Sequence, residues 1–127
     1  MIDLNIAGTS SSPAIVSRWA EGTLEMRGDS YPENSFELYQ PVFDWVKRYL
    51  ETVERPLTLN LYLLYLNTSS IKSLMDILDL LEQAHGEGRP VAVNWYYDQD
   101  NERVAELAEE FKEDCSFPFA IIGYSPC

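Results

Sequence analysis

Residues 61–72 read LYLLYLNTSSIK, and the rest of the chain is arranged around the change that occurs within them. The apolar run is long enough for a buried strand, stops at Asn67 and is followed by three hydroxyl residues. Apolar side chains then return at helical spacing, at Ile71, Leu74, Met75, Leu78 and Leu81. This pattern predicts a strand, a tight turn and a helix that has Thr68 or Ser69 at its N-cap.

The hydroxyl cluster at 68–70 allows two interpretations. A hydroxyl at the start of a helix lies beside unpaired backbone N–H groups and the positive end of the helix dipole, so it can simply cap the helix. The same location also favours a phosphate group added to that hydroxyl. Position alone makes the cap the simpler explanation.

Strands and helices alternate along the rest of the chain. A hairpin with strands at 13–19 and 23–27 precedes a first helix at 35–53, which Asn34 or Ser35 caps. A strand at 57–66, a helix at 69–85, a strand at 91–97, a helix at 102–114 and a strand at 119–123 follow. Such alternation predicts right-handed crossovers and a largely parallel sheet. We therefore expect one α/β domain over 1–127, with a mixed, mostly parallel sheet, an N-terminal antiparallel hairpin and three helices.

The first helix has an unusually wide apolar face. Its apolar side chains, from Phe36 to Val53, cover about half of the circumference at ~100° per residue. A helix that rests on one sheet usually needs less than this. The face either packs on both the sheet and a neighbouring helix or presents its flank to a partner protein.

The charge balance excludes some classes of partner. The 127 residues include 21 acidic and 9 basic side chains, which gives a net charge of −12. Binding to nucleic acid through phosphate contacts is therefore not expected, and neither is binding to an anionic membrane surface. We expect no signal peptide at the start, and the densest apolar run, 57–66, is too short to span a membrane. The two cysteines, Cys115 and Cys127, form no paired framework, so we expect a cytoplasmic protein.

No catalytic constellation is present in the sequence. The single histidine, His85, lies at the opposite end of its helix from Ser69, about 24 Å away at ~1.5 Å per residue, and cannot act as its base. No glycine-rich phosphate-binding motif occurs, and neither cysteine has a basic neighbour that would lower its pKa. Asp98, Asp100 and Glu102 are spaced like part of a calcium loop but lack its glycine and its terminal glutamate. We expect neither a metal nor another cofactor.

One alternative function stays open. In mostly parallel sheets, ligands bind at the carboxyl ends of the strands. Asn67, Asn94 and Asp98 lie near such ends. The alternative is therefore a small enzyme or a small-molecule-binding α/β domain that uses these residues.

Three short blocks carry a resemblance to a known family. They are SYPEN at 30–34, NTSS at 67–70 together with Lys72, and NWYYD at 94–98. In this order and spacing they resemble the signature blocks of the SiaC-type regulatory phosphoproteins. Each block alone is weak, but the three together are quite specific, and the resemblance covers nearly the whole chain.

The resemblance implies a fold and a switch. The fold would be like that of STAS domains and anti-anti-sigma factors, in which a phosphoacceptor hydroxyl begins the helix after a central strand. The acceptor falls on Thr68 here. The surrounding partner surface would consist of Tyr65, Asn67, Ser69, Ser70 and Lys72.

The resemblance also implies partners and an output. A SiaB-type kinase would add the phosphate, and a SiaA-type PP2C-like phosphatase would remove it. The unphosphorylated form would bind and activate a SiaD-type diguanylate cyclase, which would raise cyclic di-GMP and promote biofilm formation. The chain would then be a non-enzymatic signalling protein.

Overall fold

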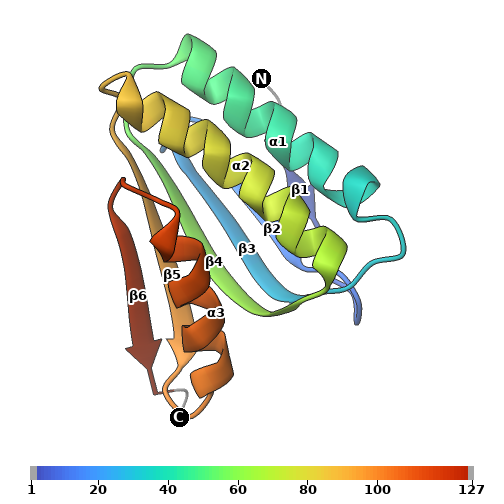
Figure 1. Cartoon of the computed structure of the whole chain (residues 1–127). Helices are drawn as coiled ribbons and strands as arrows, with labels where there is room; N and C mark the ends of the chain where they lie inside the picture. Colours follow the sequence, from blue (N-terminus) through green and yellow to red (C-terminus); the bar gives the residue numbers. More distant parts are fainter. Residues whose placement is uncertain (1–2, 126–127) are drawn as a thin grey trace.

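The strands lie side by side in the order in which they occur in the sequence. In the computed structural model, which describes residues 3–125, they form one six-stranded sheet (Figure 1). The strands are β1 (Asn5–Ile6), β2 (Ala14–Arg18), β3 (Thr23–Ser30), β4 (Leu57–Leu66), β5 (Val91–Asp98) and β6 (Phe119–Tyr124). Strand β2 is antiparallel to its neighbours β1 and β3, and β3 to β6 are parallel. The expected mixed, mostly parallel sheet with an N-terminal hairpin is confirmed.

Three helices cover one face of this sheet and leave the other face open (Figure 1). They are α1 (Ser35–Thr52), α2 (Thr68–Gly86) and α3 (Glu102–Glu113). Each crossover moves one strand further in the same direction, so three crossovers of the same hand place all three helices on one side. None of the helices in the described part of the chain is long and apolar enough to cross a membrane.

The core lies between the helices and the covered face of the sheet. Along β4 the side chains alternate, so that Leu57, Leu59, Leu61 and Leu63 are buried and the residues between them face the open side. Helix α1 packs against α2 and shares one core with the buried side chains of the sheet, and its own buried side chains include Trp45 and Tyr49. Only the first turn of α1 departs from the expected apolar face, because Phe36 is 73% exposed.

The hairpin between β2 and β3 depends on Gly22. This residue has a φ of +69°, which disfavours residues with a side chain. A Cβ atom there would also overlap the carbonyl oxygen of Pro56 and the hydroxyl of Tyr49. Glycine therefore lets the turn approach the start of β4 closely.

A β-bulge interrupts β4 shortly before its end. Gly28 pairs with Leu63 and Asp29 pairs with Tyr65, so Leu64 is an extra residue without a partner on β3. The bulge shifts the alternation of buried and exposed side chains by one residue. Leu64 and Tyr65 are consecutive exposed residues, and Leu66 returns to the core.

Candidate functional site

Helix α2 is capped by Asn67, so the expected cap at Thr68 or Ser69 is wrong. The side-chain oxygen of Asn67 accepts hydrogen bonds from the Ser70 backbone N–H at 2.9 Å and from the Ser69 hydroxyl at 3.2 Å. Asn67 has an extended backbone, as N-cap residues usually do. Asparagine is as good a cap as serine, and it comes one residue earlier. Thr68 is consequently the first residue within α2.

The three consecutive hydroxyls have different surroundings. Ser70 is fully buried and forms hydrogen bonds with Ser30 at 2.8 Å and Ser35 at 3.2 Å. The Ser69 hydroxyl pairs with Ser35 at 2.7 Å. Thr68 is exposed, and its hydroxyl has no hydrogen-bond partner among residues 3–125. Of the three, Thr68 alone combines exposure with an unengaged hydroxyl.

A buried chain of hydroxyls anchors this region to β3 and α1. It runs from Tyr39 through Ser30 to Ser70, with 2.8 Å between successive oxygens, and continues to Ser35. Burial raises the pKa of Tyr39, although hydrogen bonds from Ser30 and Ser70 partly oppose this effect. Tyr39 is therefore neutral at physiological pH and holds the start of α1 against the start of α2.

The amino-terminal ends of α1 and α2 lie next to each other, joined by the bond between Ser35 and Ser69. Helix α1 is capped by Asn34, whose side chain accepts from the Glu37 N–H at 3.0 Å, so the expected cap at Asn34 or Ser35 is confirmed. The positive ends of two helix dipoles point to this edge of the molecule. A negative group on Thr68 would therefore be favoured locally.

Lys72 lies one turn after Thr68 and on the same side of α2. Its ammonium is 3.8 Å from a carboxylate oxygen of Asp76, and the lysine side chain is 81% exposed. Such an exposed pair is weak. The lysine can therefore leave Asp76 for a stronger anion at little cost.

Exposed apolar side chains lie on the segments that meet at the start of α2. Tyr31 follows β3, Tyr65 lies in the bulged end of β4, and Phe36 lies in the first turn of α1. Tyr31 and Tyr65 meet edge to face, with 6.0 Å between ring centroids, and they are 45% and 53% exposed. We call Tyr31, Phe36 and Tyr65 the aromatic rim. Grouped exposed apolar side chains are typical of an interaction surface.

The alternative set of strand-end residues does not converge. Asn94 lies on the open face of the sheet, opposite Asn60, with its side-chain amide 3.1 Å from the Asn60 oxygen. Asn60 and Asn67 are separated by about 23 Å along β4 at ~3.3 Å per residue. Asp98 accepts a hydrogen bond from the Asp100 N–H at 2.9 Å and closes the turn before α3. These residues belong to three separate places.

Among residues 3–125, neither the histidine nor the described cysteine is placed to activate the Thr68 hydroxyl. His85 lies in the last turn of α2, where it packs edge-on against Phe117. Burial raises the pKa of the Cys115 thiol to about 11, and the charge of Glu82 adds to this effect. No three His, Cys, Asp or Glu residues lie close enough within 3–125 to hold a metal ion.

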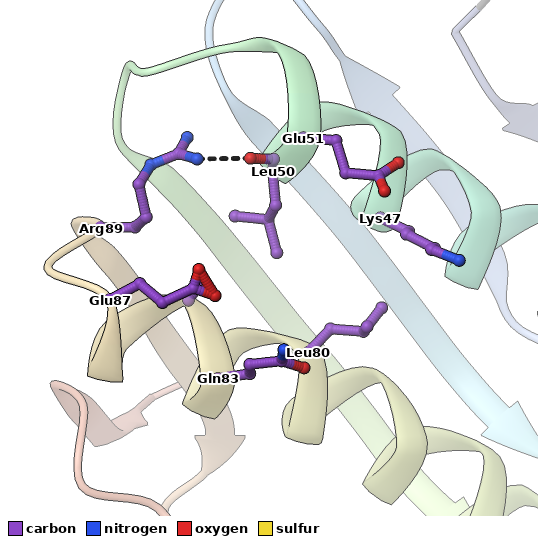
Figure 2. A pocket seen from close by; sticks show the side chains of 8 residues that line it. Lys47, Leu50, Glu51, Leu80, Gln83, Glu87 and Arg89 are labelled. Carbon is purple, nitrogen blue, oxygen red and sulfur yellow. Dashed lines mark hydrogen bonds between the residues drawn. The ribbon is translucent and has the colours of Figure 1, made fainter.

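A groove of about 590 Å³ lies at the opposite ends of α1 and α2 (Figure 2). Lys47 and Glu51 line it from α1, Gln83 lines it from α2, and Glu87 lines it from the position directly after α2. The guanidinium of Arg89 donates hydrogen bonds to the carbonyl oxygens of Leu50 and Val53. Helix α1 has no basic residue in its own last turn, so Arg89 supplies the positive charge there. We assign this groove a structural role.

Several residues of the site could not be assigned from the sequence. Ser30 and Tyr31 belong to the first resemblance block, which was the only sequence signal for them. Ser35 was expected only as a possible helix cap, and Phe36 was expected in the core. Their role depends on the contact between the starts of two helices, which no local pattern encodes.

Comparisons with known proteins agree on one group. The profile of the SiaC family regulatory phosphoproteins matches residues 6–124. An uncharacterized protein of Pseudomonas aeruginosa (strain UCBPP-PA14) is 68% identical over 121 residues, which cover 95% of this chain and 96% of that protein.

Two solved structures from Pseudomonas aeruginosa extend this comparison. Apo-SiaC is 66% identical with a TM-score of 0.92, and the match covers 96% of this chain and 99% of that one. The crystal structure of the diguanylate cyclase SiaD in complex with its activator SiaC gives 66% identity and a TM-score of 0.94, covering 96% of this chain and 100% of that one.

Proposed function

The chain belongs to the SiaC family of regulatory phosphoproteins, and on this basis we propose that it binds and activates a diguanylate cyclase under the control of Thr68 phosphorylation. The observation that carries the proposal is the complex of SiaD with its activator SiaC, whose matched chain is 66% identical to this one. The unphosphorylated form is the activator. The chain itself acts without catalysis, in the cytoplasm.

The surroundings of the three hydroxyls support Thr68 as the acceptor. A kinase must reach the hydroxyl, and Ser70 is fully buried while Ser69 is bonded to Ser35 and Asn67. Thr68 is exposed at the first position of α2. Backbone N–H groups and the dipoles of two helices would stabilise a phosphate there without unfolding the site.

The aromatic rim supports the idea that a phosphate blocks partner binding. Phosphorylation adds a charge of about −1.5 to −2 and three strongly hydrated oxygens. A partner that packs on Tyr31, Phe36 and Tyr65 would have to remove water from this group. A SiaB-type kinase would therefore switch the cyclase off, and a SiaA-type PP2C-like phosphatase would restore cyclic di-GMP synthesis and biofilm formation.

Mapping the phosphate tests the acceptor. The purified chain, its Thr68→Ala variant and its Ser69→Ala variant are incubated with the SiaB-type kinase and ATP, then analysed by intact mass and peptide mass spectrometry. We expect one phosphate on Thr68 in the parent and in Ser69→Ala, and none in Thr68→Ala. A phosphate on Ser69 or Ser70 of the parent would overturn the assignment.

A cyclase assay tests the activity. The unmodified chain is expected to increase the rate at which a SiaD-type cyclase makes cyclic di-GMP from GTP. The phosphorylated chain is expected to leave the rate at its basal value. Stimulation that is the same with both forms would contradict the proposed switch while leaving the activator role intact.

A further inference from the structure

The two edges of the sheet differ in how they are protected. Strand β1 forms one edge and has only two residues. Strand β6 forms the other edge, has six residues, FAIIGY, and contains neither a charge nor a proline. Native proteins usually protect edge strands with charges, prolines, bulges or short length, because an open edge can pair with another strand. Strand β6 shows none of these devices.

The register of β5 and β6 identifies the backbone groups that face outward. The Val93 N–H bonds to the Pro118 carbonyl, and the Gln99 N–H bonds to the Tyr124 carbonyl. Even-numbered residues of β6 therefore turn their backbone toward β5. The N–H and C=O groups of Phe119, Ile121 and Gly123 point the other way, where no strand of residues 3–125 pairs with them.

We propose that β6 pairs with β6 of a second copy of this chain, antiparallel and about a two-fold axis at Ile121. In that register Ile121 lies opposite Ile121 of the second copy, and Phe119 lies opposite Gly123. All three outward-facing residues then form hydrogen-bonded pairs, so the strand is complementary to itself. Two sheets would join into one continuous sheet. This inference goes beyond the proposed function and does not depend on it.

The neutral edge of β6 allows pairing with a second copy, and its small area sets the strength of the contact. The outward edge is neutral, so it offers no charge that would select a basic or an acidic strand of another protein. Pairing would also cover Ile122 and Tyr124, which are 36% and 37% exposed. A six-residue strand spans only about 20 Å and cannot bury the ~800 Å² per partner of a standard stable interface. We therefore infer a weak dimer that forms at high protein concentration.

The net charge gives the contact a distinctive salt dependence. Each copy carries a net charge of −12, so two copies repel each other as they approach. Salt screens this repulsion, since the Debye length falls as ionic strength rises. Association through β6 should therefore strengthen with salt, whereas association through ion pairs would weaken.

Sedimentation velocity of the full chain tests the proposal. Samples range from about 10 µM to about 1 mM protein, in about 50 mM and about 500 mM NaCl. The variant Ile122→Lys places like charges near each other across the axis and should raise the dimer dissociation constant about fivefold or more. The control Thr23→Lys adds the same charge to the same face of the sheet, but in β3, and should leave the constant unchanged. Far-UV circular dichroism confirms that both variants are folded.

Amide hydrogen exchange tests whether the outer edge of β6 forms the dimer contact. The amides of Ile121 and Gly123 should exchange slowly at high protein concentration and rapidly at low concentration, whereas the Ile122 amide, which faces β5, should be protected at both. A monomer at every concentration would overturn the proposal. So would a dimer in which the Ile121 and Gly123 amides exchange freely, or one that both lysine variants weaken equally.

Discussion

Asn67 and Thr68 occupy adjacent positions with different roles in stability. Replacing Asn67 by alanine removes the acceptor of the Ser70 N–H and should lower the free energy of unfolding by about 1 kcal/mol. Replacing Thr68 by alanine removes no hydrogen bond of the described residues and should change it by less than ~0.5 kcal/mol. Urea unfolding measures both. An equal loss in the two variants would mean that Thr68 takes part in the cap.

The same two residues show what the sequence could and could not predict about the start of α2. The turn and the start of the helix followed from the spacing of apolar and hydroxyl residues, whereas the candidate acceptor at Thr68 followed from the family resemblance. The cap was placed one or two residues too late, because Asn67, Thr68 and Ser69 all belong to residue types that cap helices. Tertiary contacts decide which of these residues becomes the cap. One such contact is the buried hydrogen bond between Ser70 and Ser30.

Tyr39 should make the free energy of unfolding depend on pH in the alkaline range. Burial raises its pKa above the ordinary value of 10.0. The unfolded chain therefore loses this proton first, so the contribution of Tyr39 is complete below pH ~10 and is lost as pH rises above it. Urea unfolding between pH 9 and pH 11, roughly, should show a decline that is smaller in Tyr39→Phe. Parallel pH profiles of the two proteins would show that Tyr39 titrates normally.

At the level of elements, Arg89 links the loop after α2 to the end of α1. Its guanidinium donates to the carbonyl oxygen of Leu50 (Figure 2) and to that of Val53. Arg89→Ala should lower the free energy of unfolding by about 1–3 kcal/mol, and Arg89→Lys should lose less because the charge is kept. The control is Arg103→Ala on the exposed side of α3. Equal small losses in Arg89→Ala and Arg103→Ala would contradict a capping role.

Most helices and strands could be predicted to within one or two residues, because the apolar period changes clearly at Asn34, Pro56, Asn67 and Pro90. The bulge at Leu64 could not. The run LYLLYL is apolar at every position, so a residue inserted into the alternation leaves no mark in it. Phe36 fits the apolar stripe of α1 but lies in the first turn, beyond the part of the helix that rests on the sheet.

At the scale of the whole molecule, we propose that the cyclase-binding surface lies at the end of the sheet where α1 and α2 begin. Tyr65→Ala removes one ring of the aromatic rim. The concentration of the chain that half-maximally activates the cyclase should rise about tenfold or more. Met75→Ala is the matched control, because Met75 is also an exposed large apolar residue, 42% exposed, but lies two turns along α2. Titrating the cyclase with each variant measures the difference. Equal losses would place the surface elsewhere.

The most direct measurement is the affinity of a SiaD-type diguanylate cyclase for the chain before and after stoichiometric phosphorylation of Thr68, by isothermal titration calorimetry. Both forms should unfold at similar urea concentrations, because the phosphate lies at helix ends that favour it. We predict that the phosphorylated chain binds at least about tenfold more weakly, a loss of ~1.4 kcal/mol or more. Equal affinity of the two forms would contradict the account.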